Sequence, residues 1–113
     1  MTTFKITHGE RAAWQRRATR ELTAILNAHP DLPIIRWTVG STGSIVVGHV
    51  NGLAPAWQVR EVFDAWRTAL TLTEHPESVG AGATYLRAAA HRDRVHVRLT
   101  ATVLDEEDRV GTS

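Results

Sequence analysis

The sequence predicts an α+β fold, a two-layer sandwich in which two helices pack on one face of a four-stranded antiparallel sheet in the order α-β-β-α-β-β. Two segments have helical periodicity, each is followed by strand-like runs, and the last run alternates strictly between apolar and polar residues. With 113 residues and no cysteine, the chain can bury a core without disulfides. We expect one domain over residues 1–104 and an acidic tail without regular structure over residues 105–113.

The first predicted helix begins near Thr7 and ends before His29-Pro30. Thr7 and Glu10 have the spacing of a capping box, in which each side chain satisfies a free backbone N–H group. Apolar residues then recur every three or four positions, which indicates one buried stripe: Trp14, Ala18, Leu22 and Ile25. We therefore expect Trp14 in the core. Residues 4–6 are a candidate for a short edge strand.

Residues 34–39 and 45–50 predict a β-hairpin, because two β-branched runs are joined by five residues of Gly, Ser and Thr. Alternation along the first run places Ile35, Trp37 and Val39 inward. Arg36 and its alternate neighbour Thr38 then face outward, where His49 of the second run can join them.

The second predicted helix begins at Pro55 and runs to about residue 72, with an apolar stripe that includes Phe63 and Trp66. Trp57 lies nine residues before Trp66, so at about 100° per residue the two rings point to opposite sides of the helix. Trp57 is therefore expected either to pack over a sheet edge or loop of its own chain, or to face a partner, because tryptophan is enriched at interface anchors. Residues 73–83 are predicted to form a mobile loop.

Residues 84–104 predict a second hairpin that turns at residues 91–94. Strict alternation identifies its second arm as a half-buried strand, and the inward residues are Val95, Val97, Leu99, Ala101 and Val103. The outward residues of this arm are then His96, Arg98, Thr100 and Thr102. By the same alternation, the outward residues of the first arm are Tyr85, Arg87, Ala89 and His91.

Two landmarks occur twice, and they raise the question of a duplicated αββ unit. Ala-Trp-Gln stands at residues 13–15 and 56–58, and His-Pro stands at residues 29–30 and 75–76. The distance from Trp to His-Pro differs by three residues between the copies. Both a duplication and a coincidence of short motifs remain open at this point.

The leading hypothesis for function is a small non-enzymatic interaction module that forms a homodimer through the outer face of the sheet. Two helices cover only one side of a sheet, and small outward residues permit close approach of a second copy. A different protein partner is an alternative occupant of the same face. The candidate residues of the interaction surface are Arg36, Trp57, Tyr85, Arg87, His96, Arg98 and Thr100.

A second hypothesis is weak binding of single-stranded nucleic acid by arginine and tyrosine on the same face. Residues 105–109 contain four acids and one arginine, a net charge of −3; since the whole chain carries +1, residues 1–104 carry +4. The acidic tail is expected to compete for the basic surface. A third hypothesis is a small-ligand carrier or enzyme with a pocket between the helices and residues 73–83.

The sequence favours a non-enzymatic protein, because it presents no nucleophile with a base and no paired carboxylates. The chain contains six histidines, but none has the spacing of a metal site, so neither a metal nor a cofactor is expected. No run of about 20 apolar residues is present. We therefore expect no membrane association and a cytoplasmic location.

Overall fold

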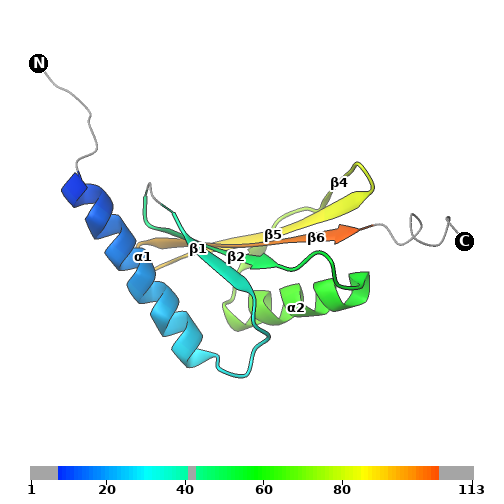
Figure 1. Cartoon of the computed structure of the whole chain (residues 1–113), viewed down its shortest axis with the longest axis horizontal. Helices are drawn as coiled ribbons and strands as arrows, with labels where there is room; N and C mark the ends of the chain where they lie inside the picture. The colour runs from blue at the N-terminus through cyan, green and yellow to red at the C-terminus, as the bar shows by residue number, and fades with distance from the viewer. Residues whose placement is uncertain (1–7, 41–42, 105–113) are drawn as a thin grey trace, which may run out of the picture.

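A computed structural model of the chain describes residues 8–40 and 43–104 and contains two helices and a six-stranded mixed sheet. In chain order the elements are α1 (His8–Ala28), β1 (Arg36–Val39), β2 (Ile45–Val50), α2 (Ala56–Ala69), β3 (Thr73–Glu74), β4 (Ser78–Gly80), β5 (Ala83–Arg92) and β6 (Val95–Leu104). Figure 1 shows α2 running along one side of the sheet, with α1 beside the β1–β2 hairpin. The α+β class is confirmed.

The expected four-stranded antiparallel sheet is wrong in strand number and in one strand direction. The strand order is β1-β2-β6-β5-β3, and β4 also pairs with β5. Only β2 and β6 are parallel; the other pairs are antiparallel. The reason lies in residues 73–80, which form β3 and β4 along the free edge of β5 instead of a loop. β3 and β4 carry the chain along the sheet in the direction of β2 before β5 begins. As a result, β5 runs opposite to β2, and β6, which is antiparallel to β5, runs parallel to β2.

The core lies between the helices and the inner face of the sheet, and its strand parity is as predicted. Val95, Val97 and Leu99 are completely buried in β6, which is paired on both sides. From α2, the stripe with Val59, Phe63 and Trp66 packs against them. The Trp66 ring lies edge-on to Trp37 at 5.4 Å between centroids, and its Nε1 donates a hydrogen bond of 2.8 Å to the carbonyl oxygen of Pro33.

The start of α1 extends beyond the sheet, and for this reason Trp14 is not the core residue that we expected. The helix has 21 residues and is about 30 Å long, whereas the six residues of β2 span about 20 Å. Ala18 and Ile25 are its buried residues, and Trp14 is half-buried and outside the group of described side chains packed around the core. Three predictions fall outside the described residues: the Thr7 side of the capping box, a strand at residues 4–6, and the tail at residues 105–113.

The topology does not support a symmetric duplication behind the repeated Ala-Trp-Gln motif. The two hairpins occur in mirrored order, β1-β2 and then β6-β5, with β2 and β6 parallel. A two-fold axis perpendicular to the sheet would make β2 and β6 antiparallel. An axis along the strands would place the helices on opposite faces, but both contribute to one core.

Candidate functional site: the outer sheet face

The sheet face opposite the helices is formed by alternate residues of β1, β2, β5 and β6. Its residues, called the outer face below, are Arg36, Thr38, Ile45, Val47, His49, Tyr85, Arg87, Ala89, His91, His96, Arg98, Thr100 and Thr102. The register aligns Thr100 with His49 on one side and with Arg87 on the other. Of the seven residues predicted for the interaction surface, six therefore lie on this one face.

The outer face carries positive charge that the described residues do not compensate. Arg36, Arg87 and Arg98 form no ion pair within residues 8–40 and 43–104. Across those residues, the outward-facing strand positions hold no aspartate or glutamate. Because guanidinium groups stay ionised at any physiological pH, the face is cationic under all such conditions.

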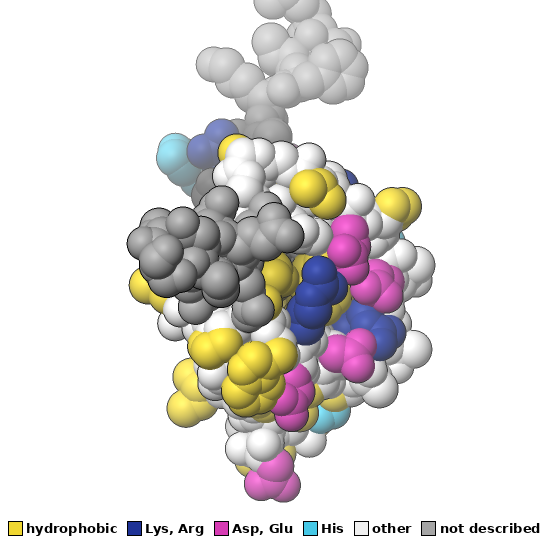
Figure 2. Space-filling view, turned by 90° about the vertical axis from the view of Figure 1, so that its right-hand side faces the viewer, with side chains coloured by type: hydrophobic (Ala, Val, Ile, Leu, Met, Phe, Trp, Pro, Cys, Tyr) yellow, Lys and Arg dark blue, Asp and Glu magenta, His cyan; other side chains and the backbone are white. Residues whose placement is uncertain are grey.

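The acids of the described chain lie elsewhere, and four of them pair with other arginines. Arg60 pairs with Glu77, Arg67 with Asp64, and Arg92 with Glu21. Arg92 faces the helices, where its Nη1 also donates to the carbonyl oxygen of Leu70. Figure 2, which looks onto one end of the molecule, shows basic and acidic side chains intermingled there. This mixture is typical of a solvated surface and differs from the one-sign charge of the outer face.

A hollow of about 360 Å³ lies on the outer face between β5 and β6. We call it the β5–β6 hollow. Ala89 creates it, because this small side chain stands between Arg87 and His91 on β5 and opposite Arg98 on β6. The outward side chains that line it are His75, Arg87, Ala89, His96, Arg98 and Thr100.

His75 was not among the predicted site residues, because it lies in the segment interpreted as a loop. Its backbone N–H donates a hydrogen bond of 2.8 Å to the carbonyl oxygen of Arg87, which holds the residue beside β5 at the rim of the hollow. No local pattern in the sequence announces this position. It follows from the pairing of β3 and β4 with β5, which is a contact between segments and not a property of either one.

His96 contributes a neutral ring to the same hollow. Burial, together with the positive charges of Arg98, His91 and His75, lowers the pKa of His96 below its ordinary value of 6.5. Its ring lies edge-on to His91 at 4.7 Å between centroids. Within the described residues, its buried Nε2 has no hydrogen-bond partner. The hollow thus combines the imidazole of His96 with two guanidinium groups that form no ion pair within the described residues.

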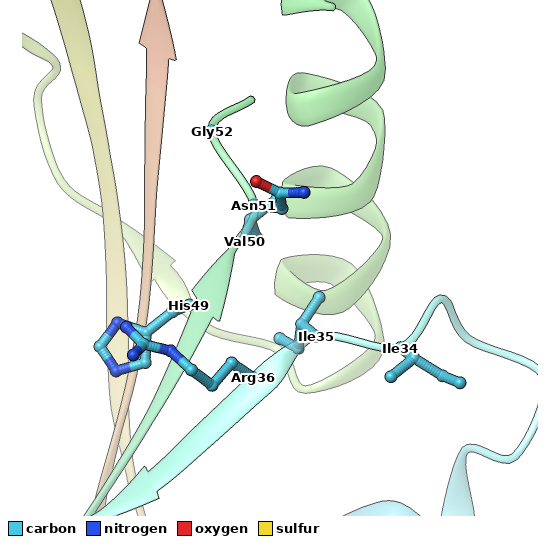
Figure 3. Close-up of a pocket in the computed structure, with 7 residues that line it drawn as sticks. All are labelled: Ile34, Ile35, Arg36, His49, Val50, Asn51 and Gly52. Carbon is cyan, nitrogen blue, oxygen red and sulfur yellow. The ribbon is translucent and has the colours of Figure 1, made fainter. Parts of the chain in front are cut away.

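His49 is held between two threonines on the neighbouring strands. Its Nε2 lies 3.1 Å from Thr38 Oγ1, and its Nδ1 lies 3.4 Å from Thr100 Oγ1. Burial and the charge of Arg36 lower the pKa of His49. Figure 3 shows the Arg36 and His49 side chains together on one side of the ribbon, at the rim of an edge hollow of about 600 Å³. Ile34, at the other end of this hollow, points into solvent and is 100% exposed.

A third hollow adjoins the β5–β6 hollow and contains the one tyrosine of the chain. It has a volume of about 310 Å³, and its side-chain lining includes Ser78, Tyr85 and Thr102. Arg87 and Thr100 line both hollows, so the two are neighbours on one surface. The Tyr85 side chain is 38% exposed, which leaves part of its ring available for stacking.

Trp57 is the one predicted interaction residue that lies away from the outer face. It stands in the first turn of α2, is 64% exposed, and borders a hollow of about 320 Å³ between α2 and β3. This is the region in which the sequence allowed for a ligand pocket. Acids and arginines line much of it, including Arg60, Asp64 and Glu74, and they pair with one another or with neighbouring residues.

The outer face can therefore bind anions through guanidinium, imidazole and hydroxyl groups. Among the side chains that the structure describes, no three of His, Asp or Glu gather closely enough to hold a metal ion. Neither of the two described helices is long and apolar enough to cross a membrane. Comparisons of the chain with models of known families, with curated proteins and with solved structures found no match.

Proposed function

We propose that the protein is a small non-enzymatic binding module whose outer face binds single-stranded nucleic acid. The observation that carries the proposal is a set of three arginines, Arg36, Arg87 and Arg98, that form no ion pair within the described residues and lie on a sheet face whose described strand positions hold no outward carboxylate. An uncompensated cationic surface attracts a polyanion, and the release of counterions from the phosphates favours the complex.

Single strands suit this face better than a duplex does. Each base of a single strand is free to stack, and the partly exposed ring of Tyr85 lies two residues from Arg87 on the same side of β5. Hydroxyl groups of Thr100 and Thr102 line the surface between the charged groups. Since Tyr85 is the only tyrosine in the chain, stacking contributes little, and we expect weak, salt-sensitive binding with low sequence preference.

The first test is fluorescence anisotropy with a labelled oligo-dT of about 20 nucleotides at low salt. We expect a dissociation constant in the micromolar range, and at least a tenfold loss of affinity when Arg36, Arg87 and Arg98 are all replaced by glutamine. The triple variant Arg16→Gln, Arg20→Gln, Arg60→Gln is the matched control, because it removes the same charge from the helix side. If neither the wild type nor a chain ending at Leu104 binds at low salt, the proposal is wrong.

A homodimer through the outer face is the second candidate, and the small side chain of Ala89 at the centre of this face favours it. Two facing copies would place arginines against arginines with no outward strand carboxylate between them, so we rank this candidate below nucleic acid. Light scattering at micromolar concentration distinguishes the two. A dimer that Ala89→Arg converts to monomer would support self-association, and a monomer throughout would exclude it.

A further inference from the structure

We infer that the β5–β6 hollow and the adjoining Tyr85 hollow together bind a terminal nucleotide of the strand, with the terminal phosphate between Arg87 and Arg98 and the base beside Tyr85. This inference rests on the proposed function and specifies where one end of the strand lies.

The charge of the hollow matches a terminal phosphate better than a phosphate within the strand. A phosphomonoester carries a charge of about −1.5 to −2 at pH 7 and three acceptor oxygens. A phosphodiester carries one negative charge. Arg87 and Arg98 supply two positive charges that no described carboxylate neutralises, and guanidinium groups bind phosphate oxygens in a bidentate manner.

Polar side chains complete the lining. Thr100 lines both hollows, with its Oγ1 3.4 Å from the carbonyl oxygen of Gly48 and from His49 Nδ1, and His75 and His96 line the β5–β6 hollow. A terminal phosphate would thus meet guanidinium, hydroxyl and imidazole groups from β5, β6 and the segment before β4.

The spacing of the two hollows suits one nucleotide. Arg87 and Tyr85 are two positions apart on the same side of β5, which corresponds to about 7 Å along a strand. Arg87 and Thr100 line both hollows, so the two hollows adjoin each other at these side chains. Ala89 leaves the room for the phosphate, and a larger side chain at this position would fill it without a change in charge.

The experiment compares three oligonucleotides of one sequence that carry a 5′-phosphate, a 3′-phosphate or a hydroxyl group at both ends. We expect one terminal phosphate to strengthen binding about tenfold. Ala89→Leu, which fills the hollow, and Arg98→Gln, which removes one guanidinium, should each abolish this difference. Arg36→Gln is the matched control, because it should weaken all three strands equally and leave the difference intact.

The outcomes separate the inference from the proposed function. Equal binding of all three strands overturns the inference and leaves the proposed function standing, whereas no binding of any strand overturns both. A difference that persists in folded Ala89→Leu or Arg98→Gln also overturns the inference. A final arm adds a nucleoside monophosphate as competitor. If the competitor removes the tighter binding of the strand with the terminal phosphate, a free nucleotide binds at the same site. If it does not, the site requires the strand.

Discussion

At the scale of single residues, Ala89 and the alternate valines of β6 illustrate what a sequence reveals directly. Side chains along a strand point to opposite faces in turn, so one buried residue fixes the direction of all the others. The inward direction of Val95, Val97 and Leu99 is therefore confirmed, together with the outward direction of His96 and Arg98. That Ala89 leaves a hollow could not be predicted, because the hollow depends on which residue of another strand lies opposite.

Trp66 and Trp57 provide a residue-scale test of the helical stripe. Trp66 is buried and donates a hydrogen bond to the carbonyl oxygen of Pro33, whereas Trp57 is largely exposed. Trp66→Phe should lower the free energy of unfolding by about 1–3 kcal/mol, because it removes buried contacts and a hydrogen bond. Trp57→Phe should change it by less than about 0.5 kcal/mol. Urea unfolding measures both changes in the free energy of unfolding. Equal losses in the two variants would contradict the assignment of Trp66, and not Trp57, to the buried stripe of α2.

His96 and His49 predict how stability depends on pH. The pKa of each is lowered in the folded protein, so the unfolded chain takes up protons first as the pH falls. Stability should be constant above about pH 7.5, fall through the unfolded pKa of 6.5, and level off below the folded pKa.

Urea unfolding between pH 8 and pH 5 tests this prediction. His96→Gln should reduce the fall in stability, and His8→Gln, at the exposed start of α1, is the matched control. A rise in stability toward pH 5 in the wild type would contradict the assigned sign.

At the scale of elements, the long helices and strands were predictable and the short edge strands were not. The apolar stripe of α2 and the alternation of β6 each leave a clear periodic pattern, because one side is buried. The residues of β3 and β4 are exposed on every side, so they have no such pattern and resemble a loop. Their effect is nevertheless large, because they set the direction of β5 and β6.

Hydrogen exchange tests this arrangement of strands. β6 pairs with a neighbour on each side, so its amides should exchange most slowly. Amides that pair residues 73–80 with β5 should exchange faster than those of β6, yet measurably slower than those of an unstructured peptide. Exchange of this whole segment at the rate of a free peptide would contradict the edge strands and the reversal that they cause.

At the scale of the whole molecule, composition gave the balance of charge but not its placement. The near-neutral total of +1 hides one face with three arginines that have no ion pair within residues 8–40 and 43–104, and another side on which several charges pair. The placement of six of the seven candidate residues on the outer face was predictable from strand parity alone. Their proximity was not, because it depends on β6 lying between β2 and β5, and this order is set by pairing over long distances in the chain.

The acidic segment after β6 gives a prediction at this scale. Four acids follow Leu104 directly, and four extended residues span at most about 14 Å, which is the distance along β6 from Leu104 to Thr100 beside Arg87. A chain that ends at Leu104 should bind oligo-dT several-fold more tightly at low salt, with a smaller gain at high salt because screening weakens the competition. Replacement of the four acids by their amides should give the same gain. Unchanged affinity in both variants would show that the segment does not compete.

The salt dependence of single-strand binding tests the central claim most directly. Three phosphate contacts predict that log K falls with log[salt] with a slope of about −2, and the double variant Arg87→Gln, Arg98→Gln should bring the slope to about −0.7. Oligo-dT binding measured between 20 and about 200 mM salt gives both slopes. Absence of binding at the lowest salt, or a slope that the double variant leaves at its wild-type value, would contradict the assignment of the outer face as the binding surface.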